Sequence, residues 1–168
     1  MSEALAQAIV RLLKEKKMTV TTVESCTGGL LSATLVDVSG ASEVFYQGVV
    51  TYANEAKVRL VGVKEATLAA YGAVSEETAR EMAEGGAKAA KADACLSVTG
   101  IAGPSGGTAE KPVGLVYIGC FVNGTTVVKK NLFSGNRREV REQSVEAAFQ
   151  LLFDCLQMEI RGIGHEIS

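Results

Sequence analysis

Apolar residues recur every three or four positions in several segments of the chain, which is the spacing of one helix face. The pattern is clear at Leu5, Ile9 and Leu12, and it predicts an amphipathic helix over residues 3–16. Ser75 followed by two glutamates is a favourable helix start, because these side chains satisfy or complement the free N–H groups of a first turn. Further helices are predicted from residue 30 to about 39 and over 55–60 (with Asn54 as its cap), 65–71, 76–90 and 137–158.

Short runs rich in β-branched residues alternate with these helices and predict strands over 19–23, 45–52 and 94–99. The clearest hairpin spans 113–132, because Asn123-Gly124 is a strong two-residue hairpin turn. Strands that alternate with helices and end in one hairpin predict an α/β fold. The expected architecture is a three-layer α/β/α sandwich with a mixed, mostly parallel sheet. The 168 residues predict a single domain, with 159–168 as a tail.

Charge and composition then exclude several classes of function. A formal net charge of −2 argues against a nucleic-acid-binding protein. No apolar run approaches the roughly 20 residues that span a bilayer, and the N-terminus lacks the pattern of a signal peptide. The 4 cysteines are dispersed and read as reduced, mostly buried thiols. We therefore expect a cytoplasmic protein with no nucleic-acid or membrane partner.

The single histidine, His165, limits the chemistry further. A Ser-His-Asp triad would have to recruit this residue near the C-terminus, and no G-x-S-x-G motif is present. Metal-ligating residues are not clustered, so no metal site is predicted. A nucleophilic serine in this chain would need a base other than histidine.

Two glycine-rich loops leave the carboxyl ends of predicted strands. The first, 24–29, places Ser25 between a strand and a helix start, where free N–H groups favour an anion. The second is 100–108, and because ligands of open α/β sheets bind at this edge, the two loops are expected to wall one cleft. The alternatives are a turn that only caps a helix and a flexible surface loop. Neither loop has a Walker or dinucleotide-binding glycine pattern.

Basic residues supply two further candidates. Lys57 follows Tyr52 at the start of a short predicted helix, and a lysine serves as the base for a serine when burial lowers its pKa from about 10.4. The phenol of Tyr52 would relay a proton or fix the lysine, although most lysines are simply solvated. Arg137 and Arg141 share one helix face and could hold one phosphate between them. Ion pairing with neighbouring glutamates fits their spacing equally well.

Five segments follow one another in a distinctive order: residues 23–29 (VESCTGG), 50–57 (VTYANEAK), 72–75 (GAVS), 98–108 (VTGIAGPSGGT) and 133–137 (FSGNR). Together they resemble the C-terminal domain of CinA, the competence/damage-inducible protein, over residues 3 to about 158. The resemblance implies an enzyme that hydrolyses the amide of nicotinamide mononucleotide to nicotinate mononucleotide and ammonia, in bacterial pyridine-nucleotide salvage. It also implies an α/β fold, no metal or cofactor, and a homodimer. Full-length CinA carries an N-terminal domain that this sequence does not contain.

The same resemblance implies that Ser25 is the nucleophile, with Lys57 as general base and Tyr52 assisting. Backbone amides near Cys26 and Thr27 are expected to stabilise the oxyanion, while the Cys26 thiol itself is interpreted as a packing group. The expected substrate-binding residues are completed by Gly28, Gly29, Thr99, Gly100, Gly103, Gly106, Gly107, Arg137 and Arg141. Two alternatives remain open: a non-catalytic module that binds a pyridine nucleotide, and a serine amidase for another small amide.

Overall fold

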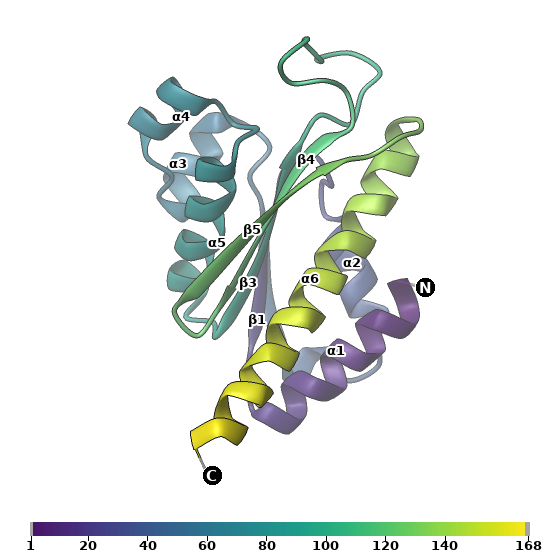
Figure 1. Cartoon of the computed structure of the whole chain (residues 1–168), viewed down its shortest axis with the longest axis vertical. Coiled ribbons are helices and arrows are strands. Elements are labelled where there is room, and N and C mark those ends of the chain that lie inside the picture. Colours follow the sequence, from purple (N-terminus) through teal and green to yellow (C-terminus); the bar gives the residue numbers. More distant parts are fainter. Residues whose placement is uncertain (1, 167–168) are drawn as a thin grey trace.

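A five-stranded sheet forms the centre of the computed structural model, which describes residues 2–166 and the side chains of residues 2–158 (Figure 1). The strand order is β2-β1-β3-β4-β5, where β1 is paired in parallel with β2 and β3, and β4 is antiparallel to both β3 and β5. Four strands therefore share one direction, which confirms a mixed, mostly parallel sheet with one hairpin. The strands are β1 (Val20–Glu24), β2 (Phe45–Val50), β3 (Ala94–Gly100), β4 (Leu115–Val122) and β5 (Thr125–Leu132).

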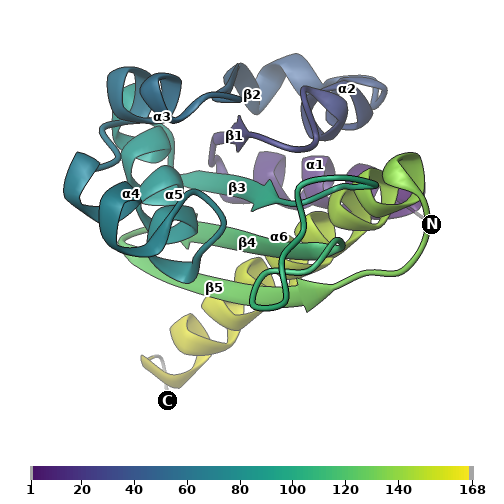
Figure 2. The same cartoon turned by 90° about the horizontal axis from the view of Figure 1, so that it is seen from above.

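Helices cover both faces of the sheet, and this confirms the three layers (Figures 1 and 2). One face carries α1 (Ser2–Lys16), α2 (Leu30–Val36) and α6 (Arg137–Glu166). The other face carries α3 (Asn54–Val61), α4 (Glu65–Tyr71) and α5 (Glu76–Ala90). A short 3₁₀ turn, Ala41–Glu43, leads into β2 and was not predicted from the sequence. None of the helices in the described part of the chain has the length and apolar character of a bilayer-spanning segment.

The hydrophobic core is divided by the sheet into two clusters. The larger cluster includes Leu13, Phe149 and Ile118, which are fully buried between the sheet and the α1/α6 layer. The smaller one lies beneath α5, where Gly86 lets the helix approach closely. A Cβ at Gly86 would lie only 2.4 Å from Val23 Cγ2, so the small buried residues of α5 allow the helix to pack tightly on the sheet.

All predicted element boundaries except the end of α6 agree with the structure to within three residues; the largest of these smaller differences is at α2, which ends at Val36 rather than near residue 39. Ser75 caps α5 by accepting a hydrogen bond from the Thr78 N–H, as predicted. Asn54 is not a cap: the extended residue before α3 is Ala53, and Asn54 is the first helical residue.

Helix α6 also runs past its predicted end at Met158 as far as Glu166, so most of the predicted tail is helical. Gly162 and Gly164 lie in this stretch, but a glycine costs a helix only about 1 kcal/mol and does not block its hydrogen bonds as a proline does. Residues 167–168 and the side chain of His165 lie outside the described residues.

Candidate active site

Backbone hydrogen bonds place Ser25 at the carboxyl edge of the three parallel strands. The Ser25 N–H donates to the Val98 carbonyl at 2.9 Å, and the Thr51 N–H donates to the Glu24 carbonyl at 2.7 Å. These bonds continue the pairing of β1 with β3 and β2 by one residue beyond the strand ends. The chain then turns through residues 25–29 before α2 begins at Leu30. The strand–turn–helix expectation is therefore confirmed, with Ser25 five residues ahead of the helix rather than in its first turn.

A buried lysine faces this serine. Lys57 Nζ lies 3.1 Å from Ser25 Oγ, and it donates hydrogen bonds to the Thr51 carbonyl at 2.7 Å and the Tyr52 carbonyl at 3.3 Å. Lys57 is 1% exposed, and none of the ion pairs between described residues gives it a carboxylate partner. Burial therefore lowers the pKa of Lys57, and a weaker interaction with Cys26 opposes that shift. A lysine that loses its proton readily beside a hydroxyl has the chemistry of a general base.

A cavity of about 270 Å³ opens beside Ser25 and Lys57. Nine of the residues predicted for the site line it: Ser25, Cys26, Tyr52, Lys57, Thr99, Gly100, Gly103, Gly106 and Arg137. Sequence reasoning missed five other lining residues, Ala73, Val74, Ile101, Ala102 and Ser105. Their side chains are small or apolar and give no chemical signal, but all five fall within the segments 72–75 and 98–108 that were singled out as motifs.

The five remaining predicted residues, Thr27, Gly28, Gly29, Gly107 and Arg141, do not line this cavity. Gly28 and Gly29 have φ values of 57° and 105°, so the left-handed turn itself requires them. A Cβ at Gly107 would lie 2.8 Å from the Val113 nitrogen, which shows that this glycine packs the loop against the turn that leads into β4. The contacts of these glycines explain their presence without a ligand.

Tyr52 and Arg137 form a bridge over the cavity. The Arg137 guanidinium donates to the Tyr52 phenol oxygen at 3.1 Å and to the Gly103 carbonyl at 2.8 Å. Tyr52 thus turns its hydroxyl toward the arginine and contacts Lys57 through its backbone carbonyl. The phenol was expected to assist Lys57 directly, and in this structure its hydrogen-bond partner is Arg137 instead.

The Cys26 thiol is poorly suited to nucleophilic attack. Burial raises its pKa to about 11, and the positive charges of Arg141 and Lys57 offset this only in part. A thiol with that pKa stays protonated at neutral pH, whereas the attacking form is the thiolate. The part of the chain with described side chains also contains no cluster of three or more potential metal ligands. The hydroxyl with a buried amine beside it is that of Ser25.

Comparison with known proteins identifies the family of the chain. The family model for the CinA C-terminal domain matches residues 2–156. The chain belongs to the CinA C-terminal domain family. A CinA-like protein of Kosmotoga olearia is 54% identical over 151 residues, which make up 90% of this chain and 36% of that protein. A putative competence-damage inducible protein of Clostridioides difficile is 56% identical over 138 residues, 82% of this chain and 33% of the relative.

Solved structures of the CinA superfamily share the fold over nearly their full lengths. The competence/damage inducible protein CihA of Agrobacterium tumefaciens superposes with a TM-score of 0.90 at 40% identity, over 93% of this chain and 95% of that one. A CinA superfamily protein of Klebsiella pneumoniae gives a TM-score of 0.91 at 34% identity, over 94% and 99% of the two chains. By contrast, the chain spans about a third of the length of the curated relatives named above.

Proposed function

We propose that this chain is a serine amidase that hydrolyses the carboxamide of nicotinamide mononucleotide to nicotinate mononucleotide and ammonia. The observation that carries the proposal is the 3.1 Å contact between Lys57 Nζ and Ser25 Oγ at the wall of a cavity. Family membership supports a CinA-type domain, and the residue pair supports acyl transfer by serine with lysine as the base.

In the proposed reaction, neutral Lys57 takes the proton of Ser25 as Oγ bonds to the carboxamide carbon. The tetrahedral intermediate places a negative charge on the former carbonyl oxygen, which needs hydrogen-bond donors. Among the described residues, neither the Cys26 N–H nor the Thr27 N–H donates a hydrogen bond to another residue, so both can serve in this role. Removing one oxyanion donor typically costs about 2.7–4 kcal/mol of transition-state stabilisation.

Collapse of the intermediate breaks the bond between carbon and nitrogen, and Lys57 returns its proton to the departing ammonia. Water then attacks the nicotinoyl ester of Ser25, giving its proton to Lys57, and the ester bond breaks to release the carboxylic acid and restore the Ser25 hydroxyl. The sum is one water consumed and one ammonia released for each amide. No step calls for a metal or cofactor.

The lining of the cavity suits a small substrate that has a cationic ring and a phosphate. Its volume of about 270 Å³ is near the small end of ligand sites, roughly 300–1,000 Å³. Tyr52 is 61% exposed at the cavity mouth, and a phenol ring attracts a cation such as a pyridinium over its face. Arg137 spends two hydrogen bonds on protein groups, and a guanidinium has five donors, which leaves some for a phosphate.

The test compares the wild-type protein with Ser25→Ala in the presence of nicotinamide mononucleotide and without added metal. We expect equal amounts of ammonia and nicotinate mononucleotide from the wild type, and at least a 1,000-fold slower rate from Ser25→Ala, since the nucleophile is lost. Ser42→Ala is the matched control, because Ser42 is exposed in the 3₁₀ turn before β2 and does not line the cavity. Unchanged turnover in Ser25→Ala would disprove the proposal. Thermal stabilisation by the nucleotide without product would favour a binding module instead.

A further inference from the structure

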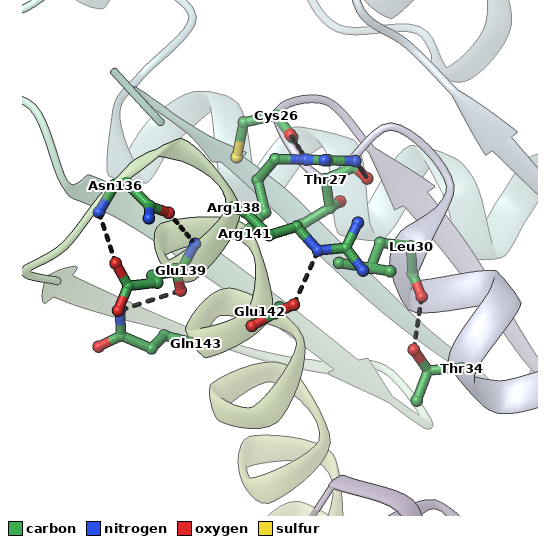
Figure 3. A network of polar contacts seen from close by, with 10 residues as sticks. All are labelled: Cys26, Thr27, Leu30, Thr34, Asn136, Arg138, Glu139, Arg141, Glu142 and Gln143. Atoms are coloured by element: carbon green, nitrogen blue, oxygen red, sulfur yellow. Dashed lines mark hydrogen bonds and ion pairs between the residues drawn. The ribbon is translucent and has the colours of Figure 1, made fainter. Parts of the chain in front are cut away.

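Arg141 contacts the turn that carries the candidate nucleophile without lining the cavity. It extends from α6 so that its Nε donates to the Cys26 carbonyl at 3.1 Å and its Nη2 donates to the Thr27 carbonyl at 2.9 Å. Figure 3 shows the side chain lying along these two carbonyls, while Arg138, one turn earlier on the same helix, points to Glu142. Both nitrogens of Arg141 that make marked contacts, Nε and Nη2, therefore donate to backbone oxygens rather than to a carboxylate.

Because the peptide bond is planar, a contact that holds a backbone carbonyl also fixes the direction of the next backbone N–H. In a trans peptide the C=O of one residue and the N–H of the next point in opposite directions. By holding the Cys26 carbonyl, Arg141 therefore fixes the Thr27 N–H pointing away from its own guanidinium. The Ser25 carbonyl is held in the same way by the Gly28 N–H at 3.1 Å, which fixes the direction of the Cys26 N–H. These are the two N–H groups proposed above to bind the oxyanion, and neither donates to another residue.

Glu24 fastens the other side of the turn. Its side chain is fully buried and accepts hydrogen bonds from the Leu31 N–H at 2.8 Å, the Ser32 N–H at 3.1 Å and the Ser32 hydroxyl at 2.7 Å. Because Ser32 spends its only hydroxyl proton on Glu24, Thr22 must be the donor in its 2.7 Å contact with Ser32. The first turn of α2 is thus tied back to the end of β1, and residues 25–29 form a short closed loop between the two attachments.

We propose that Arg141 and Glu24 are positioning residues that hold the Ser25 turn in its reactive shape, with Arg141 orienting the Thr27 N–H of the proposed oxyanion site. The inference rests on the proposed serine chemistry, but it does not depend on which amide is the substrate. It departs from the sequence-based expectation that Arg141 binds the substrate phosphate. Arg137, which does line the cavity, keeps that expected role.

The experiment compares Arg141→Ala, Arg141→Lys and Glu24→Gln with the wild type by two measurements. The first is steady-state hydrolysis of nicotinamide mononucleotide. The second is the rate at which an alkyl fluorophosphonate labels Ser25, followed by intact mass. In that labelling a bond forms between Oγ and phosphorus as the P–F bond breaks, the serine proton passes to Lys57, and fluoride leaves. Labelling needs the nucleophile and the oxyanion donors but no specific substrate.

We expect kcat and the labelling rate to fall about 100-fold in Arg141→Ala, with KM within about twofold of the wild type, because the lost interaction acts on the transition state. Arg141→Lys should show a similar loss, since an ammonium does not reproduce the two-donor contact with both carbonyls. Glu24→Gln should likewise lower kcat and the labelling rate with little change in KM, because its side-chain N–H₂ group would face N–H donors and could not accept from them. Arg138→Ala is the matched control and should behave as wild type, and Arg137→Ala should raise KM.

A raised KM with unchanged kcat in Arg141→Ala would make Arg141 a substrate-binding residue and overturn the inference. Unchanged kinetics and labelling in Arg141→Lys and Glu24→Gln would overturn it as well. Circular dichroism and melting temperature identify variants that do not fold. If Arg141→Ala does not fold, the result for Arg141→Lys tests the inference in its place. A wild type that is labelled but leaves the nucleotide intact would disprove the proposed substrate alone, and the inference would stand or fall on the labelling rates. A wild type that is not labelled would overturn both.

Discussion

The proposed chemistry depends most on Lys57, which is buried. Lysine side chains are almost never fully buried without a charged partner. Its long aliphatic part fills space in the interior, while its amine reaches two carbonyls and one hydroxyl. The sequence offered Lys57 and Ser25 as candidates, but they are 32 residues apart and no local rule relates them. Only the parallel pairing of β1 with β2, followed by the turn into α3, brings them together.

Activity should depend on pH through Lys57. Burial lowers its pKa, so the neutral amine forms at a lower pH than in an exposed lysine. We expect kcat/KM to rise with pH on its acid side, with a midpoint below the ordinary lysine value of about 10.4. The measurement is a pH–rate profile of the wild-type enzyme with nicotinamide mononucleotide.

Lys57→Arg is the sharpest companion variant for that profile. A guanidinium keeps its proton at every accessible pH, so we expect at least a 100-fold loss of activity that high pH does not restore. Substantial activity in this variant, or a rate that does not change with pH, would remove Lys57 from the role of base.

At the scale of elements, the position of Lys57 depends on how closely α3 approaches α5. Gly85 of α5 lies against the last turn of α3, where an added Cβ would be 1.7 Å from the Val61 carbonyl oxygen. A backbone oxygen cannot move aside as a side chain can. The glycine therefore sets the distance between the two helices, and with it the position of the lysine near the start of α3.

Gly85→Ala should push the two helices apart. Inserting a methyl group into a packed contact costs about 1–3 kcal/mol, and the displaced α3 carries Lys57 with it. We expect a lower melting temperature together with a lower kcat. Lys88→Ala on the same helix is the control, because Lys88 is exposed and its loss should leave both quantities near the wild-type values. Full activity and stability in Gly85→Ala would show that α3 adapts without moving Lys57.

The elements themselves were largely predictable, because helical and strand periodicity is local information. What the sequence could not give was the direction of individual side chains across elements. Arg137 and Arg141 share a helix face, yet one bridges Tyr52 and Gly103 and the other binds two carbonyls of the Ser25 turn. Tyr52 was similarly placed near Lys57 in sequence, while its hydroxyl points to Arg137. These outcomes depend on tertiary packing that no spacing encodes.

At the scale of the whole molecule, the buried lysine ties folding stability to pH. Between its lowered pKa in the folded chain and about 10.4 in the unfolded chain, Lys57 is protonated only in the unfolded state. The unfolded state then binds more protons, so the contribution of Lys57 to the free energy of unfolding becomes more favourable as pH rises through that window.

Comparison with Lys57→Met isolates this effect. We expect the free energy of unfolding of the wild type, minus that of the variant, to increase with pH across the window, and to stay level below the folded pKa. Urea unfolding at a series of pH values measures it. A difference that is independent of pH would mean that Lys57 has an ordinary pKa in the folded chain.

Two further expectations from the sequence, the homodimer and the cytoplasmic location, stay predictions.

Arg141 lies 115 residues after Cys26, whose carbonyl it holds. The reactive turn is therefore fastened by a residue that is synthesised long after the nucleophile. A growing chain on the ribosome can complete Ser25, Lys57 and the first parallel strands while the segment that fastens the turn does not yet exist. If Arg141 positions the turn as we propose, the full rate of hydrolysis is reached only once α6 has been made and has docked, and a nascent chain is far slower until then.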